Sequence, residues 1–196
     1  MALVVLLRGV NVGGHKTFRP SALAEQLKHL EAVNIGAAGT FVIRRPGTQA
    51  QLRDELTRRL PFSAEIMICT DREITALMSQ NHFADQPMRP DIVRFVSVLS
   101  KRPDSAPSTP MSFPANGEWL LKILARDGRF LFGVYRRHMK AISYLGTLDR
   151  LFGVPVTTRN WNTVTAIAKM LGNWRTEVVP GPVRKATTTT RRRGEQ

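Results

Sequence analysis

The sequence predicts an α+β fold of two ferredoxin-like halves, each an α/β sandwich with an antiparallel or mixed sheet and its helices on one face. Three observations support this. Short apolar runs alternate with helical patterns in the order strand, helix, two strands, helix, strand. A similar order follows a second time. Of the 196 residues, 42% are hydrophobic, which is enough for a core without disulfides. The expected parts are residues 1–81, residues 82–182 and a disordered basic tail at 183–196.

The first half begins with a strand, a helix and a hairpin. LVVLL (residues 3–7) is a continuous apolar run, typical of a buried strand. Ser21 marks the start of a helix whose apolar side consists of three leucines, Leu23, Leu27 and Leu30. Residues 33–45 contain two short extended runs around two glycines, which predicts a strand pair joined by a hairpin.

A capping box predicts the second helix, because Thr48 and Gln51 have the T-x-x-Q spacing of a helix start. The inward face of this helix is formed by Leu52, Leu56 and Leu60. A fourth strand at 64–69 closes the unit and contains Cys69, the only cysteine. A lone cysteine in an apolar run is typical of a small buried hydrophobe, and a chain without a disulfide fits the reducing cytoplasm.

Another capping box precedes the second half, which contains a proline-rich loop. Thr70 and Glu73 predict a helix whose apolar face carries Ile74, Leu77 and Met78. A strand is expected at 92–99, and the two halves should meet near residues 81–91. Residues 101–117 hold four of the twelve prolines, so we expect no helix longer than one turn there.

A hairpin and two helices complete the second half. Strands at 118–126 and 129–137 flank Asp127–Gly128, which is a strong two-residue hairpin signal. A helix is predicted over 139–152, ending at a glycine and presenting Ile142, Leu145 and Phe152. The last helix begins near Trp161 and carries inward Val164, Ile167, Ala168 and Leu171.

The charge of the chain is its most unusual bulk property. Lys and Arg number 29 against 15 Asp and Glu, a formal net charge of +14 that attracts polyanions. From Arg184 onward the chain has almost nothing apolar, so we expect this tail to add affinity for nucleic acid without adding stability. The remaining basic residues form either a binding surface or a solvated surface typical of an arginine-rich proteome.

The stretch LLRGVNVGG (residues 6–14) raises the question of a phosphate site. It fits neither the Walker A loop nor the dinucleotide fingerprint, because the glycine spacing differs and no helix begins directly after it. One interpretation is a glycine-rich exit from a strand. The other is a phosphate cradle. In the cradle, the ligand-binding residues would be Arg8, Asn11, Gly13, Gly14 and Lys16.

A second polar block, TTRNWNTVT, lies at 157–165. Arg159, Asn160, Trp161 and Asn162 place a guanidinium, two amides and an indole at a helix start, where backbone N–H groups favour an anion. In one interpretation, Arg159 and Trp161 bind and stack a nucleotide or oligonucleotide. In the other, an asparagine caps the helix and Trp161 packs on the core.

These two blocks, LLRGVNVGG and the region 154–171, resemble the signature blocks of the family called domain of unknown function 1697, a group of uncharacterised bacterial proteins. The resemblance implies two α+β halves of ferredoxin-like type, and it implies no activity, cofactor or catalytic residue. The chain departs from the family pattern at GAAGTF (36–41), where relatives have a Tyr and a Ser-Gly-Asn turn. It also departs at RRHMKAIS (136–143), where Ser-Lys is expected. An active site that used those positions would be lost here.

The sequence contains no motif of a metal site or of a familiar catalytic class. The four histidines are scattered without acidic or cysteine partners, so no zinc site is expected, and no cofactor is predicted. Neither G-x-S-x-G nor a carboxylate pair in a known motif is present. Catalysis stays open, because active sites assemble from distant positions. The opening MALVVLL is too short for a signal peptide, and no run is long enough for a membrane span.

Two main function classes follow from these features. The first is a cytoplasmic module that binds nucleic acid or another polyanion. The second is an enzyme or binder that acts on a small phosphorylated ligand or nucleotide in a cleft between the halves. A protein-interaction role through an exposed sheet edge is a third and vaguer choice. The sequence leaves the oligomeric state open. For the second class, we expect one cleft to be lined by Arg8, Asn11, Arg159 and Trp161.

Overall fold

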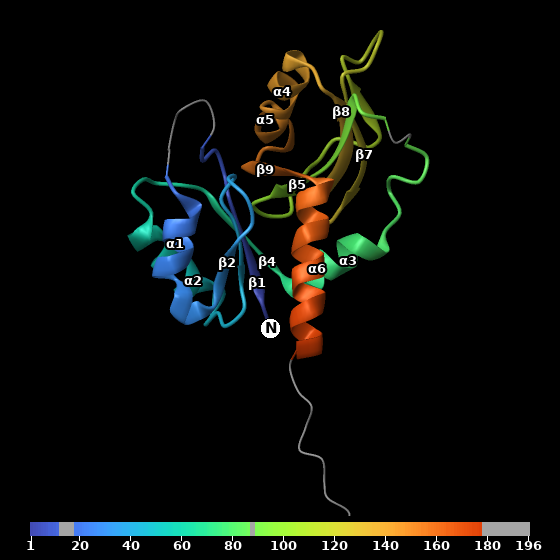
Figure 1. Ribbon diagram of the computed structural model, residues 1–196. Coiled ribbons are helices and arrows are strands. Elements are labelled where there is room, and N and C mark those ends of the chain that lie inside the picture. Colours follow the sequence, from blue (N-terminus) through green and yellow to red (C-terminus); the bar gives the residue numbers. More distant parts are fainter. Residues whose placement is uncertain (12–17, 87–88, 178–196) are drawn as a thin grey trace, which may run out of the picture.

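Two antiparallel sheets organise the chain in the computed structural model (Figure 1). The structure describes residues 1–11, 18–86 and 89–177. The first sheet has the strand order β2-β3-β1-β4, and the second has the order β6-β7-β8-β5-β9. The α+β class predicted from the sequence is therefore confirmed. The predicted basic tail lies outside the described residues and stays a prediction.

The first sheet and its helices form the unit that the sequence predicts. Its strands are β1 (Leu3–Leu7), β2 (Ala32–Asn34), β3 (Thr40–Ile43) and β4 (Ile66–Thr70). Its helices are α1 (Pro20–Gln26), a 3-10 turn (Lys28–Leu30) and α2 (Gln49–Arg59). The element order βαββαβ with strand order 2-3-1-4 is ferredoxin-like. Helix α1 begins at Pro20, before the predicted Ser21, because proline suits the first helical position.

The predicted capping boxes are confirmed at both helices that carry them. The Gln51 backbone N–H donates to the Thr48 hydroxyl at 3.1 Å, and the Thr48 N–H donates to the Gln51 side chain at 2.8 Å. The same reciprocal pair joins Thr70 and Glu73 at the start of α3 (Asp71–Ser79). Each box satisfies two N–H groups that a helix start would otherwise leave unpaired.

The second sheet repeats the strand order of the first. Its elements are β5 (Ile92–Leu99), β6 (Met111–Phe113), β7 (Leu121–Asp127), β8 (Phe130–Arg136), α4 (Met139–Leu145), α5 (Leu148–Phe152), β9 (Val156–Asn160) and α6 (Trp161–Glu177). If β6 is set aside, the strands of this half are β5, β7, β8 and β9 in chain order. Their order in the sheet, β7-β8-β5-β9, is then 2-3-1-4, as in the first sheet. The segment between β5 and β7 contains no helix, as its prolines predict.

Three details of the second half differ from the sequence-based expectations. Strand β6 was not expected inside the proline-rich segment. The helix predicted over 139–152 is two helices, interrupted at Gly146 and Thr147, and Ile142 is 50% exposed rather than inward. The hairpin turn is Gly128–Arg129, because Asp127 still pairs with Phe130 and Gly128 has the positive φ of 55° that the turn requires.

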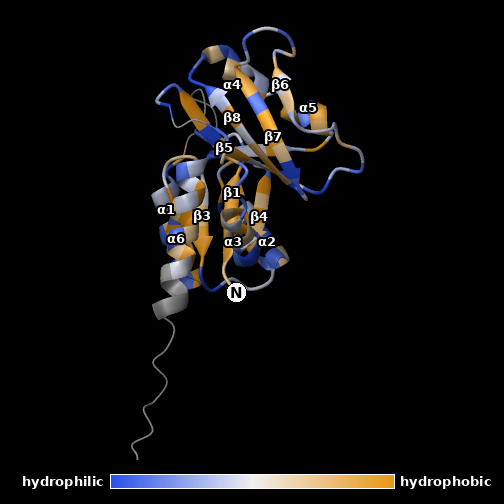
Figure 2. Cartoon of the chain, turned by 90° about the vertical axis from the view of Figure 1, so that its right-hand side faces the viewer, coloured by the Kyte–Doolittle hydropathy of each residue, from blue (hydrophilic) through white to orange (hydrophobic). Residues whose placement is uncertain are grey.

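The core continues between the two sheets, where α3 and α6 lie side by side (Figure 1). Alternate residues of β1 face opposite ways: Leu3, Val5 and Leu7 pack against α1 and α2, whereas Ala2, Val4 and Leu6 belong to the central core. Figure 2 shows the resulting hydrophobic colours along β1, β3 and β4. Buried residues of α3, α6 and the second sheet complete this central core. Helices α3 and α6 thus lie on the face of the first sheet opposite α1 and α2.

Within the described residues, no helix combines the length and the apolar character that a membrane crossing needs.

Candidate functional site

Arg159 of β9 lies buried between the two sheets, with only 7% of its surface exposed. A guanidinium has five N–H donors. All five have acceptors within hydrogen-bond distance, because Nε, Nη1 and Nη2 contact two threonine hydroxyls and several backbone carbonyls. The acceptors at 2.7–2.9 Å are Thr40 Oγ1, Thr157 Oγ1, Thr158 O, Leu7 O and Ala38 O. No donor of Arg159 is left for a ligand.

The positive charge of Arg159 is stabilised by backbone carbonyls and threonine hydroxyls and not by a carboxylate. Its hydrogen-bond acceptors are all uncharged, and burial lowers the pKa of the guanidinium to about 10. At neutral pH the side chain therefore stays protonated. Since its acceptors lie on β1, on β3 and the turn before it, and on β9, Arg159 joins the second sheet to the first.

Two further arginines cross the same boundary. Arg8, directly after β1, donates from Nε to the Val156 carbonyl at 3.0 Å and pairs with the Asp149 carboxylate. Arg129, in the turn between β7 and β8, donates to Glu73 at 2.9 Å and to the Ile68 carbonyl at 2.7 Å. Arg8 reaches from the first half to the second, whereas Arg129 and Arg159 reach in the opposite direction. We call Arg8, Arg129 and Arg159 the inter-sheet arginines.

Asn11 serves the loop that follows β1. Its side-chain amide donates to the Ala37 carbonyl at 2.8 Å and accepts from the Phe18 N–H at 2.9 Å. Asn11 also has a positive φ of 55°, which asparagine tolerates better than most residues. The predicted cradle residues Gly13, Gly14 and Lys16 lie outside the described residues, so their part in a phosphate cradle stays a prediction.

An open pocket of about 440 Å³ lies where β9 runs into α6. It combines three of the predicted residues with arginines from the start of β5 and the end of β8. Its lining consists of Arg89, Pro90, Ile92, Val93, Arg94, Arg137, Asn160, Trp161 and Asn162. We call it the Trp161 pocket.

The first turn of α6 gives the pocket its indole. Asn160 caps the helix, because its Oδ1 accepts from the Thr163 N–H at 2.8 Å. Trp161 packs edge-on against Phe83, with ring centroids 5.0 Å apart, and its remaining surface faces the pocket. Asn162 is exposed beside it. The backbone N–H groups of Trp161 and Asn162 have no acceptor within the helix, as in any first turn.

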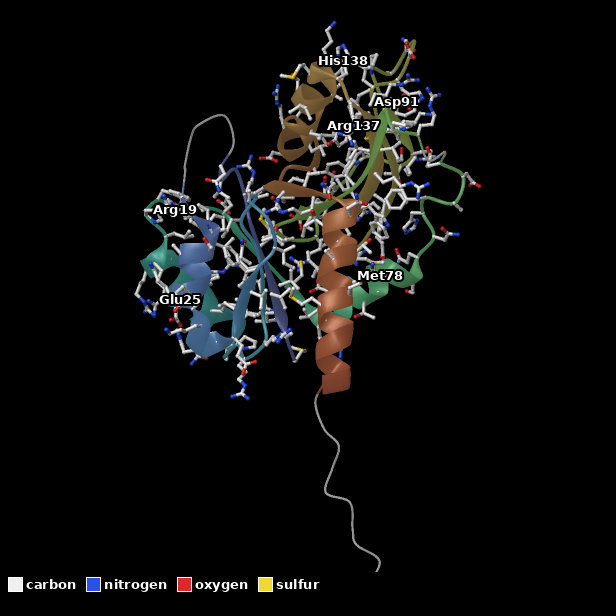
Figure 3. The ribbon with its side chains drawn as sticks, viewed as in Figure 1. Arg19, Glu25, Met78, Asp91, Arg137 and His138 are labelled. Atoms are coloured by element: carbon white, nitrogen blue, oxygen red, sulfur yellow. The ribbon has the colours of Figure 1, made fainter. Side chains whose placement is uncertain are left out.

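The arginines of the pocket use few of their donors on the protein. Among the described residues, Arg89 donates to Asp91 at 3.0 Å, Arg94 to the Gln86 carbonyl at 2.6 Å, and Arg137 to the Pro90 carbonyl at 2.9 Å. Figure 3 shows Asp91 and Arg137 close together where β5 begins and β8 ends. We call Arg89, Arg94 and Arg137 the pocket arginines. Each keeps further N–H groups that could hold an anion in two-point fashion.

Phe83 positions two of these groups at once. The Phe83 ring is 95% buried and contacts Trp161 on one side. The guanidinium carbon of Arg94 lies 5.6 Å from the centroid of the same ring. The indole and the cation are therefore held in fixed relation by a residue of the connection between α3 and β5.

The expected common cleft of Arg8, Asn11, Arg159 and Trp161 stays a prediction, and the Trp161 pocket is not that cleft. Arg8 and Arg159 lie at one boundary, but their guanidiniums are directed at protein carbonyls and a carboxylate. Of the four residues, Trp161 alone lines the Trp161 pocket. The pocket arginines were missed as site residues because they are separated by up to 48 positions in the chain and meet only through the pairing of β5 with β8.

A comparison with models of protein families finds a match for this chain. The model of the family described as "Protein of unknown function (DUF1697)" matches residues 1–118, which is more than half of the chain. The chain belongs to the DUF1697 family. The match covers the LLRGVNVGG block and two of the pocket arginines, Arg89 and Arg94. The second block, around Arg159, lies beyond the matched residues.

A solved structure shares the fold of this DUF1697 protein. It is described as the structure of conserved bacterial protein SP0830 from Streptococcus pneumoniae, and it is 16% identical to this chain with a TM-score of 0.59. The similarity covers 87% of this chain and 98% of that chain. At this identity the likeness concerns the fold. No curated protein matches the chain.

Neither a cluster of metal ligands nor a reactive thiol is found in the described part of the chain. It contains no group of three or more His, Cys, Asp or Glu side chains placed to hold a metal ion. Cys69 is fully buried in the central core, and burial raises the pKa of its thiol to about 12. A thiol with so high a pKa is a poor nucleophile at neutral pH.

Proposed function

We propose that this DUF1697 protein binds nucleic acid, and that the Trp161 pocket is where it does so. The observation that carries the proposal is the combination of an indole with the pocket arginines in one open pocket. A guanidinium can donate two hydrogen bonds to phosphate oxygens, and a nucleobase can stack on the face of a tryptophan ring. Both types of contact recur at sites that bind single-stranded nucleic acid.

The charge of the chain supports this choice over an uncharged ligand. The formal net charge of +14 draws polyanions toward the protein before any specific contact is made. Near the pocket, the Asp91 carboxylate pairs with Arg89 at 3.0 Å, which leaves Arg94 and Arg137 uncompensated by an ion pair among the described residues. A phosphate in the pocket would thus meet a net positive field.

A free nucleotide or small phosphorylated molecule is the second candidate. The pocket volume of about 440 Å³ falls within the range of about 300–1,000 Å³ that small-molecule sites occupy. Such a ligand would bind in the second half of the chain and not between the halves, because the inter-sheet arginines occupy that boundary. A cytoplasmic location, which the single cysteine favours, would suit either ligand.

Fluorescence anisotropy with a labelled single-stranded RNA of eight uridines (U8) tests the proposal on the full-length chain. We expect Trp161→Ala to weaken binding of U8 at least about fivefold, since base–indole stacking is worth roughly 1–3 kcal/mol per base. Trp161→Phe keeps an aromatic face and should retain most of the affinity.

Arg58→Gln is the charge-matched control for Arg137→Gln, because Arg58 is exposed on α2 in the first half. The proposal predicts a clear loss for Arg137→Gln and little change for Arg58→Gln. Equal losses in both variants would show that U8 binds the basic surface without using the pocket. Displacement of U8 by uridine monophosphate at a similar concentration would favour the second candidate.

A further inference from the structure

We infer that the ligand is a single strand of several nucleotides, which runs along one end of the second sheet from Trp161 to a second indole, Trp119. This inference rests on the proposed function of the Trp161 pocket and extends it. It names the chemical class of the ligand, and it adds a second base-binding position that lies outside the pocket.

The strand pairing shows that the pocket and the second position share one face. Ile92 pairs with Arg136, and Arg94 pairs with Val134, which pairs in turn with Lys122. Residues directly opposite each other in antiparallel strands project from the same face. Ile92 and Arg94 line the Trp161 pocket, and Lys122 and Arg136 project from the same face of β7 and β8. Val134, between Arg94 and Lys122, is buried in the central core, so the accessible route follows the end of the sheet through Ile92 and Arg136.

Trp119 lies beside these two cations. The Lys122 Nζ is 4.7 Å from the centroid of the Trp119 ring, and the Arg136 guanidinium carbon is 4.9 Å from it. The ring is partly exposed and packs against the same central core as Trp161. Trp119 therefore presents an aromatic surface within a positively charged setting, as Trp161 does.

The two indoles lie at the same end of the sheet. Trp119 stands two residues before β7, and Trp161 follows β9 directly. The start of β7 pairs with the end of β8, and the end of β9 pairs with the first part of β5. From β9 to β7 there are three strand spacings, about 14 Å in total. Two separate bases of one strand, rather than one nucleotide, would occupy the two rings.

The positive side chains between the two indoles would attract the phosphates that link the two stacked bases. Arg94, Lys122 and Arg136 lie on the path between Trp161 and Trp119. Two carboxylates oppose them, because Arg136 lies 2.9 Å from Glu118 and 3.9 Å from Asp91. Glu118 is 72% exposed, so its pairing with Arg136 is weak and a phosphate can compete for the guanidinium.

In the free protein, the two cations hold the Trp119 ring by cation–π contacts. Stacking of a base on this ring would move the flexible Lys122 ammonium from the indole toward a phosphate of the same strand. A purely structural role for Trp119 predicts no effect of its removal on RNA affinity beyond any loss of folded protein.

The test compares the full-length protein with its variants for binding of labelled U8 and of the labelled dinucleotide U2, by anisotropy at one low salt concentration. Trp119→Ala should weaken U8 binding about five- to 150-fold and leave U2 binding unchanged. Trp161→Ala should weaken both. Trp119→Phe, which keeps the ring, should recover most of the U8 affinity.

Two results would overturn the inference: wild-type affinity of Trp119→Ala for U8, or equal losses for U8 and U2. If Trp119→Ala fails to fold in a thermal melt, Lys122→Gln replaces it and should lower U8 affinity selectively. Failure of the proposed function looks different, because the wild-type protein would then bind neither RNA, or would bind both with no dependence on Trp161.

Discussion

The inter-sheet arginines and the pocket arginines are the same residue type in opposite circumstances. Arg159 directs all five N–H donors at protein acceptors and is 93% buried. Arg137 is exposed, with one side-chain hydrogen bond to the described residues. Within this basic chain, an arginine therefore serves structure where carbonyls surround it, and it is available for a ligand where they do not.

The two sheets differ in a similar way despite their common strand order. In the first half, α1 follows the first strand and covers the sheet. In the second half, the proline-rich segment takes that place and packs Ala106, Met111 and Phe113 on the core. The opposite face of the second sheet carries Trp119, Lys122 and Arg136 at the margin of the central core. The duplicated topology thus leaves the proposed binding surface in the second half.

Replacement of Arg159 should give the largest effect on stability. Arg159→Met removes hydrogen bonds to the Leu7 carbonyl and to the Thr40 and Thr157 hydroxyls, and it leaves these buried groups unpaired. Since each unpaired buried group costs about 1–3 kcal/mol, we expect the free energy of unfolding to fall by at least about 3 kcal/mol. Urea denaturation followed by circular dichroism measures this. A loss below about 1 kcal/mol would contradict a structural role for Arg159.

Replacement of Arg129 should have the next largest effect. Arg129→Met removes the ion pair with Glu73 and the hydrogen bond to the Ile68 carbonyl, both partly buried. Hydrogen bonds of charged groups contribute about 1.5–3 kcal/mol, so we expect a loss of about 2 kcal/mol in the same denaturation experiment. RNA affinity should not change. If Arg129→Met weakened U8 binding more than it lowered stability, the division between the two arginine classes would fail.

Replacement of Arg137 should lower RNA affinity and leave stability almost unchanged, which is the reverse of the effect expected for Arg129. Arg137→Gln is expected to change the free energy of unfolding by less than about 0.5 kcal/mol, because the side chain is exposed. It should lower the slope of log affinity for U8 against log salt concentration by about 0.7, the value for one phosphate contact on a single strand. Titrations at several salt concentrations measure the slope, with Arg58→Gln as the control. An unchanged slope would remove Arg137 from the site.

The reactivity of the Cys69 thiol is the smallest expected effect. It reports on local opening of the central core, which the inter-sheet arginines border. Burial raises the pKa of this thiol to about 12, so the thiolate is scarce at pH 8 in the folded protein. We expect very slow reaction with Ellman's reagent at pH 8 and much faster reaction in urea. Arg159→Met should accelerate the reaction under native conditions. A fast reaction of the wild-type protein would show that this core opens readily.

Local patterns predicted the elements of the chain well. The Thr48 and Thr70 capping boxes, the strand at 92–99 and the absence of a helix at 101–117 all depend on residues a few positions apart. The break between α4 and α5 was not visible, because the apolar spacing continues through Gly146 and Thr147. Capping by Asn160, one of two interpretations at that site, also follows from a contact three residues away.

The sequence by itself therefore determined the α+β class, the family and the positions of most strands and helices, since short-range hydrogen bonding and hydrophobic periodicity are encoded locally. Only the tertiary structure decided what each arginine does. Arg8, Arg129 and Arg159 differ from Arg89, Arg94 and Arg137 in nothing that their neighbours in the chain reveal. They differ because the fold surrounds the first three with backbone carbonyls and carboxylates, whereas it leaves each of the others one such hydrogen-bond acceptor among the described residues, at an open pocket lined by an indole. The number of acceptors within hydrogen-bond reach is a property of the folded chain, and it determines which positive charges remain free to meet a phosphate.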